Sequence, residues 1–493
     1  METSYLPAPE QLCLTKMTEI EVAEMIEEHF DYVDPVTGRS VHLPMQFVRH
    51  YMNRDDGVLP VVVAIAQMPI VLANGSILAM RGLDRDRGII FRIPEELMQH
   101  MPKRKDCTPS AVALAMQFLC DEWLCDVATD YTGKCILIAD ALTMIERNLL
   151  PDRPVFFITA GRRGGGKTTT LHMLIMAIFG TMAPAAAWSP NEEERRKAIF
   201  SFFLAALAFI IWDNIPRGTQ ITCPHIERSC TSAYYTDRKL GVSETIATAA
   251  STIHHFTGNN IGPKGDLASR ALVVRLELDR ADPENRDFKH NDPIAWTEAH
   301  RGQIMGALFT ILLGNPSLRT PLATPAKTRF KIWWRMCGSA VENAAKQHAE
   351  HVAALAMEPH PTCNPKEIDF KDLFLTQEED DEESSSLADL LAGMAKKWPV
   401  GNQATANDIA KLINNPGSDY LPESEQQLAI TLREFLFPNA PPGQVVTARA
   451  VGKQLGKRVG EPVKTDKLTL ILRKATDAHT KVLSYYVEVK KDQ

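Results

Sequence analysis

Cysteine is scarce in this sequence, and its spacing does not suit a metal site. The 493 residues include 9 cysteines, and no two of them form a Cys-x-x-Cys pair. Structural zinc sites take their ligands in such closely spaced pairs, so we expect no zinc site here. The odd count, together with the lack of a signal peptide, favours a reducing cytoplasmic compartment over a disulfide framework.

Long apolar runs and internal repeats are also missing. A membrane-spanning helix needs about 20 apolar residues, whereas the strongest apolar run, residues 198–211, is shorter and is soon followed by Asp213. We therefore interpret this run as buried core and expect no membrane partner. A chain of this length predicts about three domains rather than one compact core.

Positive charge is lacking overall but not locally. The net charge is −7, which argues against a protein coated with basic surface. Residues 447–493, however, carry 11 Lys and Arg against 5 Asp and Glu. Further upstream, Glu378–Glu383 is an unbroken acidic block that is followed by three serines. Because like charges repel one another, we predict a linker over residues 371–386.

A glycine-rich loop lies between a predicted strand and a predicted helix. The apolar run 155–158 leads into Gly161-x-x-x-x-Gly166-Lys167-Thr168, and residues 171–179 follow as an apolar helix. Backbone N–H groups of such a loop turn inward on phosphates, the lysine neutralises the β and γ oxygens, and the hydroxyl ligates Mg²⁺. We therefore predict a loop that binds ATP and Mg²⁺ through Gly161, Gly164, Gly165, Gly166, Lys167, Thr168 and Thr169.

A carboxylate follows the next buried strand. Residues 204–212 are apolar and lead to Asp213, which we expect to hold Mg²⁺ together with Thr168. A cap at the strand end is the structural alternative for Asp213. Many motors place Glu directly after this Asp to polarise the attacking water, whereas this sequence has Asn214. The hydrolytic base therefore stays open among Glu193, Glu194, Glu227 and Glu244.

Two further polar residues follow in order. Residues 251–256 predict a third strand, after which Asn259 is placed to sense the γ-phosphate. Arg270 precedes a fourth predicted strand, and an arginine there can act as a finger on the nucleotide of a neighbouring subunit. A salt bridge to a nearby acid is the alternative for Arg270. The predicted catalytic set is therefore Lys167, Asp213, Asn214, Asn259 and Arg270.

Two basic stretches are candidate DNA contacts. Tyr234, Tyr235, Arg238 and Lys239 suit a loop on single-stranded DNA inside a ring pore, and the tyrosines equally suit ordinary packing. A predicted helix that starts at Thr447 places several basic residues on one side, where they either contact duplex DNA or are only solvated. These residues are Arg449, Lys453, Lys457 and Arg458.

The order of these elements resembles superfamily 3 helicases and the wider AAA+ class. More closely, Asp237-Arg238-Lys-Leu-Gly241, Thr257-Gly-Asn-Asn260, Gly265-Asp266 and Asp282–Phe288 resemble the ATPase part of phage and plasmid primase-helicase proteins. The resemblance implies a hexameric ring that hydrolyses ATP and moves on single-stranded DNA. No zinc module or acidic polymerase triad is evident, so a primase, if one takes part, is expected on another chain.

The predicted fold is α/β: a P-loop, AAA+-like parallel-sheet ATPase core with a mixed α+β N-terminal domain and a C-terminal winged-helix-like domain. The N-terminal domain contains an Asn74-Gly75 hairpin signal. The leading hypothesis is an ATP-dependent DNA helicase or translocase acting in phage, plasmid or mobile-element replication. The alternative is a nucleotide-gated DNA-binding initiator or assembly protein with little hydrolysis. The predicted boundaries are 1–150 for the accessory domain, 151–290 for the core, 291–370 for a helical lid, 371–386 for the linker and 387–493 for the winged helix.

Overall fold

The chain forms two compact units, Met1–Phe374 and Leu375–Gln493, and the division falls inside helix α13 (Phe370–Glu379). None of the described helices is both long and apolar enough to cross a membrane. The computed structural model describes residues 12–54, 60–160, 164–182, 185–216, 219–238, 245–277, 288–318, 328–355, 364–379, 382–399, 403–415, 422–437, 440–441, 444–460, 462–464, 468–476 and 482–491.

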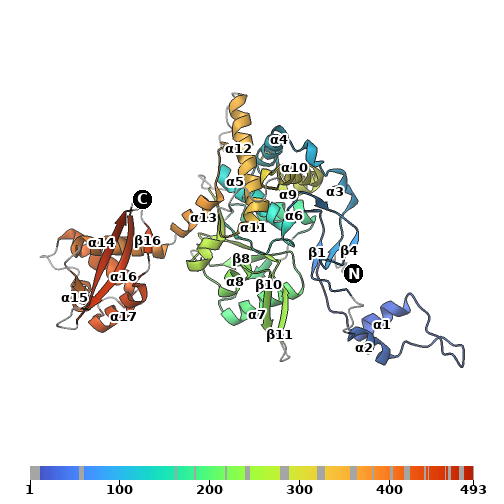
Figure 1. Cartoon of the computed structure of the whole chain (residues 1–493), viewed down its shortest axis with the longest axis horizontal. Helices are drawn as coiled ribbons and strands as arrows, with labels where there is room; N and C mark the ends of the chain where they lie inside the picture. Colours follow the sequence, from blue (N-terminus) through green and yellow to red (C-terminus); the bar gives the residue numbers. More distant parts are fainter. Residues whose placement is uncertain are drawn as a thin grey trace, which may run out of the picture. The chain divides into compact units, whose positions relative to one another are not determined.

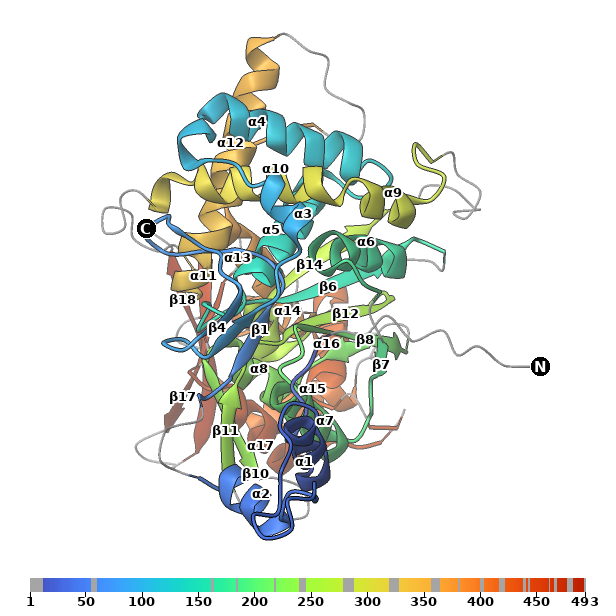
Figure 2. The ribbon, with the colours of Figure 1, turned by 90° about the vertical axis from the view of Figure 1, so that its right-hand side faces the viewer.

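A parallel sheet of five strands lies at the centre of the first unit; Figure 1 labels its strand β8, and Figure 2 labels all five strands. The strand order is β14-β6-β12-β8-β7, and every neighbouring pair is parallel. All six residues of β6 are buried, as expected for an apolar strand covered on both faces. The α/β prediction is therefore confirmed for this part of the chain. The strands are β6 (Val155–Ala160), β7 (Ala185–Ala187), β8 (Phe209–Ile215), β12 (Ile253–Asn259) and β14 (Ala271–Leu276).

Helices from distant parts of the sequence cover one side of this sheet. Figure 2 shows α4 and α10 above α5 and α6, and contacts join α4 to both α10 and α12. The buried Asp140 of α5 pairs with the buried His255 of β12 at 2.9 Å, which ties this helix to the sheet. The helices are α4 (Pro109–Phe118), α5 (Tyr131–Glu146), α6 (Lys167–Phe179), α9 (Pro293–Ala299), α10 (Arg301–Leu313), α11 (Lys331–Trp333) and α12 (Ser339–Ala354), with π-helical turns at Leu119–Trp123 and Trp334–Gly338.

The predicted boundaries at residues 150 and 290 do not separate hydrophobic cores. Trp123, Phe157, Leu308 and Val341 all belong to one continuous cluster of buried side chains. The segment that we expected to form a lid therefore packs with α4 and α5 from the predicted accessory domain. The reason is that α5 is buried along almost its whole length and needs apolar partners on all sides.

The first part of the chain adds small elements with cores of their own. Helices α1 and α2 share the buried Val22 and Val48, while β1, β5 and β4 form a three-stranded sheet. Gly75 has φ +77° in the turn of the antiparallel β2–β3 hairpin, which confirms the Asn74-Gly75 prediction. The elements are α1 (Glu19–Glu27), α2 (Met45–Met52), β1 (Ala64–Ala66), β2 (Ile70–Val71), β3 (Ile77–Leu78), β4 (Gly82–Asp84), β5 (Ile89–Phe91) and α3 (Glu95–Gln99).

Between β7 and β14 the chain builds elements that flank the sheet. Strands β10 and β11 form an antiparallel hairpin on which α7 packs, and β9 pairs with β13. A short 3₁₀ helix, Gly265–Arg270, leads directly into β14. The elements are α7 (Glu192–Leu204), β9 (Gln220–Ile221), α8 (Pro224–Cys230), β10 (Tyr234–Arg238), β11 (Thr245–Ala249) and β13 (Gly262–Pro263).

The second unit packs four helices with an antiparallel sheet of order β15-β18-β17-β16. Residues 371–379 and 382–386 lie in α13 and α14, so the predicted linker is mostly helical. Glutamate is a good helix former, and Leu387, Leu390 and Leu391 of α14 are buried on one face. The elements are α14 (Glu382–Lys397), β15 (Ala404–Thr405), α15 (Ala406–Asn414), α16 (Glu423–Leu436), α17 (Ala448–Arg458), β16 (Pro462–Lys464), β17 (Leu468–Thr476) and β18 (Leu483–Lys491).

His254 of β12 is buried as a neutral side chain. Its Nδ1 accepts a hydrogen bond from Trp212 Nε1 at 3.2 Å. Burial lowers the pKa of His254 from 6.5 to about 3, helped by the charges of Arg153 and His255. An unfolded chain binds a proton at this side chain below pH 6.5, whereas the folded chain does not until about pH 3. Folding stability is therefore lost as pH falls through this window.

Replacing His254 with glutamine is expected to flatten this pH dependence, because the amide keeps an acceptor for Trp212 and gains no charge. The free energy of unfolding is measured with urea at several pH values. As pH is lowered, it should fall less steeply in His254→Gln than in wild type, and the two slopes should differ by up to about 1.4 kcal/mol per pH unit. The exposed His50 offers a matched control, and His50→Gln should leave the slope unchanged. Parallel curves for wild type and His254→Gln would contradict the assignment.

Candidate functional site

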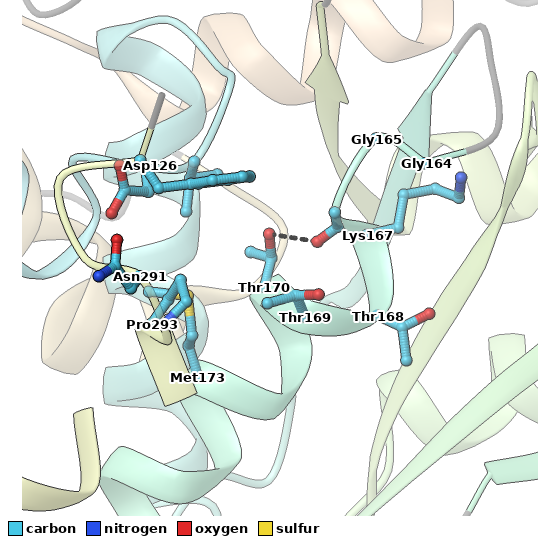
Figure 3. A pocket seen from close by; sticks show the side chains of 13 residues that line it. Asp126, Gly164, Gly165, Lys167, Thr168, Thr169, Thr170, Met173, Asn291 and Pro293 are labelled. Carbon is cyan, nitrogen blue, oxygen red and sulfur yellow. Dashed lines mark hydrogen bonds between the residues drawn. The ribbon is translucent and has the colours of Figure 1, made fainter. Parts of the chain in front are cut away.

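The glycine-rich loop connects β6 to α6 in the geometry of a phosphate-binding loop. Gly164 and Gly166 have φ of +76° and +78°, a region that residues with a Cβ rarely adopt. Helix α6 begins at Lys167, so its N-terminal N–H groups and positive dipole end face the loop. Thr170 Oγ1 donates to Gly166 O at 2.9 Å and fastens the loop to the first helical turn (Figure 3). Gly161 lies outside the described residues.

Asn259 contacts the lysine of this loop. Lys167 Nζ donates to Asn259 Oδ1 at 2.8 Å. This contact arises because β12 pairs in parallel with β6, which sets Asn259 opposite Ala160, the last residue before the loop. Partial burial lowers the pKa of Lys167, and the Asp213 carboxylate acts in the opposite direction. The structure thus brings together two residues that lie far apart in the sequence, each of which the sequence predicts separately to act on the γ-phosphate.

Asp213 lies on the next strand at the same edge of the sheet. Thr257 Oγ1 donates to Asp213 Oδ1 at 2.9 Å, which orients the carboxylate. From the sequence, Thr257 is named only as part of the Thr257-Gly-Asn-Asn260 motif and is given no role, although its spacing of two residues from Asn259 on β12 places both side chains on one face of the strand. The Asp213 carboxylate and the Thr168 hydroxyl are oxygen ligands of the kind that Mg²⁺ prefers. The side chain of Asn214 lies outside the described set.

A cavity of about 420 Å³ opens beside the loop. Figure 3 shows Gly165 and Lys167 at one end and Asp126, Asn291 and Met173 toward the other. Its volume falls within the range of about 300–1,000 Å³ that is usual for small-molecule sites. The cavity is lined by Asp126, Val127, Gly164, Gly165, Gly166, Lys167, Thr168, Thr169, Thr170, Met173, Phe288, Asn291 and Pro293.

Arg270 is not brought to this loop within its own chain. It directly precedes β14, whose first residue Ala271 pairs with Val155, the first residue of β6. The loop follows the other end of β6, so strand length alone, at about 3.3 Å per residue, separates the two edges by roughly 17 Å. Arg270 instead forms an ion pair with Asp266, which Arg329 also approaches at 3.6 Å. This ion pair is the structural alternative to an arginine finger that the sequence left open for Arg270.

In the β10–β11 hairpin, the structure supports the packing alternative for one tyrosine. Tyr235 is only 1 % exposed, and the guanidinium of Arg228 lies 4.1 Å from its ring centre, so Tyr235 is a core residue rather than a DNA contact. Side chains alternate along a strand, which leaves Tyr234 and Arg238 exposed. Lys239 lies outside the described residues, as does most of the Asp282–Phe288 motif.

Most of the predicted basic residues of α17 face solvent. Arg449, Lys453 and Lys457 are exposed. Arg458 is only partly exposed, with its guanidinium 5.4 Å from the centre of the Phe435 ring. Three of the four predicted side chains are therefore available on the surface of the second unit.

One group of side chains in the described part of the chain has the composition of a metal site, namely Cys125, Asp126 and His290. Burial raises the pKa of Cys125 to about 12, so its thiol stays protonated at neutral pH. A protonated thiol is a poor metal ligand. Both carboxylate oxygens of Asp126 accept backbone hydrogen bonds, and His290 Nε2 lies 2.8 Å from Glu122 O. We interpret the group as a structural contact.

No protein-family model matches the chain, and no curated protein sequence matches it. The NrS-1 C-terminal region in its apo form aligns over 96% of this chain and 100% of its own, with 11% identity and a TM-score of 0.41. An active helicase named SCCmec type IV Cch aligns over 93% and 78%, with 11% identity and a TM-score of 0.31. A JCV helicase aligns over 51% and 61%, with 12% identity and a TM-score of 0.22. All three scores are below 0.5, so function is inferred here from site geometry.

Proposed function

We propose that this chain is an ATP-dependent helicase or translocase that acts on DNA in phage, plasmid or mobile-element replication. The observation that carries the proposal is the Lys167–Asn259 contact of 2.8 Å beside the Asp213–Thr257 contact of 2.9 Å. A phosphate-binding lysine, a polar sensor and a metal-binding carboxylate thus meet at one edge of a parallel sheet. In the proposed mechanism Lys167 and Asn259 contact the γ-phosphate, while Thr168 and Asp213 hold Mg²⁺.

The proposal includes a ring, hexameric by resemblance, with nucleotide sites between subunits. Its support is the position of Arg270 at the sheet edge opposite the loop of its own chain. In the proposed ring, Arg270 stabilises transition-state charge on the nucleotide of a neighbouring subunit. Mass measurement of the full chain with ATP, Mg²⁺ and single-stranded DNA tests this directly. A closed oligomer is expected, and a monomer at all concentrations would contradict the ring.

DNA contacts are proposed at two surfaces that belong to different units. Arg238 ends the exposed β10 strand and, with Lys239, is proposed to contact single-stranded DNA in the pore. In the second unit, α17 and the long β17–β18 hairpin correspond to the recognition helix and wing of a winged-helix module. We place a primase partner, where one is needed, on a separate chain.

The α17 surface gives a salt-dependence prediction. Replacing Lys453 and Lys457 with glutamine should weaken duplex binding and reduce the slope of log K against log [salt] by about 2, since each lost phosphate contact contributes about 0.9. The exposed Lys396 and Lys411 provide a control of equal charge change. If the Lys396→Gln, Lys411→Gln double variant lowers the salt slope by the same amount, the change reflects the lower total charge of the protein. The α17 surface would then not be the DNA contact.

The alternative function is a nucleotide-gated initiator or assembly protein with little hydrolysis, and it has a specific observation in its favour. Asn214 follows Asp213, and the acids proposed as substitute bases have local partners. Glu193 pairs with Arg196, Glu194 with Lys197, and Glu227 accepts from Cys223 N. Glu244 lies outside the described residues. ATP turnover in the presence of DNA separates the two functions.

A further inference from the structure

The cavity beside the phosphate loop extends past the groups that phosphates need. Beyond Lys167 and Thr168 it is lined by Val127, Met173 and Phe288, and these three side chains carry no charge. Sites for small molecules are mostly apolar, with a few polar groups that fix orientation. Asn291 is such a group, since its amide offers two donors and one acceptor.

The wall of this far end comes from two segments that are distant in sequence. One is residues 126–127, between the π-helical turn and α5, and the other is residues 288–293, which lead into α9. The side chains from these two segments that line the cavity are an acid, an amide, a phenyl ring and aliphatic groups, and none of them carries a positive charge for phosphate oxygens. A nucleobase, which is flat and has a polar edge, matches this lining in chemistry.

Asp126 holds the second segment in place. Its Oδ1 accepts from Lys289 N at 2.7 Å and its Oδ2 accepts from His290 N at 2.9 Å. His290 Nε2 lies 2.8 Å from the carbonyl oxygen of Glu122, and the His290 ring stacks on Trp296 with centroids 4.2 Å apart. These contacts fix the backbone on either side of the cavity wall, so the carboxylate shapes the wall by positioning it.

We infer that residues 126–127 and 288–293 form a nucleoside subsite that takes the base of a nucleoside triphosphate, with Phe288 as a contact residue and Asp126 as a positioning residue. The inference rests on the proposed function, since the triphosphate lies on the glycine-rich loop. It goes beyond that function by assigning base binding to two segments outside the glycine-rich loop.

The test compares two probes on the full chain by calorimetry: Mg-ATP, and Mg-tripolyphosphate, which lacks the nucleoside. Phe288→Ala and Asp126→Ala should each weaken Mg-ATP binding at least tenfold and leave tripolyphosphate binding unchanged. Asp126→Asn, which keeps one acceptor oxygen, should give a smaller loss. Asp34→Ala is the matched control, because Asp34 also accepts two backbone N–H groups but lies outside the cavity lining.

Two results would overturn the subsite. The first is that Phe288→Ala and Asp126→Ala both bind Mg-ATP as tightly as the wild type does. The other is an equal loss of both probes, which would indicate damage to the loop rather than to a nucleoside contact. Lys167→Ala is expected to weaken both probes. If Lys167→Ala binds Mg-ATP and Mg-tripolyphosphate as tightly as the wild type does, the proposed function itself is overturned, and the subsite with it.

Discussion

Replacing Lys167 with alanine is expected to lower ATP turnover by about 100-fold to 1,000-fold. Removing one preorganised group that stabilises the transferring phosphate typically lowers the rate by this factor. The ammonium group lies at the loop, held by Asn259 at 2.8 Å and partly shielded from water. A charge in such a place acts on the γ-phosphate more strongly than a surface charge does. Steady-state phosphate release with saturating ATP and Mg²⁺ is the measurement.

The control for this variant is Lys197→Ala. Lys197 lies on α7, pairs with Glu194 at 2.8 Å and does not line the cavity. Its removal should leave turnover within about twofold of wild type, because exposed pairs contribute at most about 1 kcal/mol. Equal turnover by wild type and Lys167→Ala would show that the measured hydrolysis comes from elsewhere.

Replacing Arg270 with alanine is expected to lower turnover by about 1,000-fold or more, which is the effect of removing an arginine finger. Among the described residues, Arg270 forms an ion pair with the Asp266 carboxylate and donates to the Asp266 carbonyl oxygen, and it lies at the sheet edge away from the loop. A loss of turnover without a loss of ATP affinity would therefore point to a neighbouring subunit. Turnover and Mg-ATP binding are measured on the same preparation.

Mixing Arg270→Ala with Lys167→Ala chains distinguishes a finger from a structural ion pair. A mixed ring contains some sites with an intact loop from one chain and an intact arginine from the other, so part of the activity should return. Asp266→Ala, which breaks the same ion pair from the other side, should resemble Arg270→Ala in stability if the pair is only structural. No recovery at any mixing ratio, together with equal losses of Tm, would favour the structural role.

The expected phosphate end of the site rests on local signals in the sequence, for a physical reason. Strands with buried residues, glycines in a tight loop and polar residues at strand ends are local signals. Parallel pairing then brings the ends of β6, β8 and β12 to one edge, so the meeting of Lys167 with Asn259 follows from the order of the motifs. Local signals are therefore sufficient to predict that these strand ends share one edge of the sheet.

Features that depend on contacts between distant segments were not predicted. The Asp126 carboxylate meets the backbone of residues 289 and 290, more than 160 positions away, and no local pattern marks either segment. The shared core of α4, α5 and α10 likewise depends on packing between segments that lie far apart in the sequence. The division between the two units falls within the predicted linker, residues 371–386, but the described residues there are mostly helical, because helix propensity and the buried leucines of α14 favour a helix.

The most direct measurement of the central claim is ATP turnover by the full chain with and without single-stranded DNA. A motor couples hydrolysis to movement, so DNA should raise turnover at least several-fold, and Lys167→Ala should show no turnover above background in either condition. An initiator that only binds nucleotide would bind Mg-ATP and show background turnover with or without DNA. Wild-type turnover equal to that of Lys167→Ala in both conditions would contradict the motor.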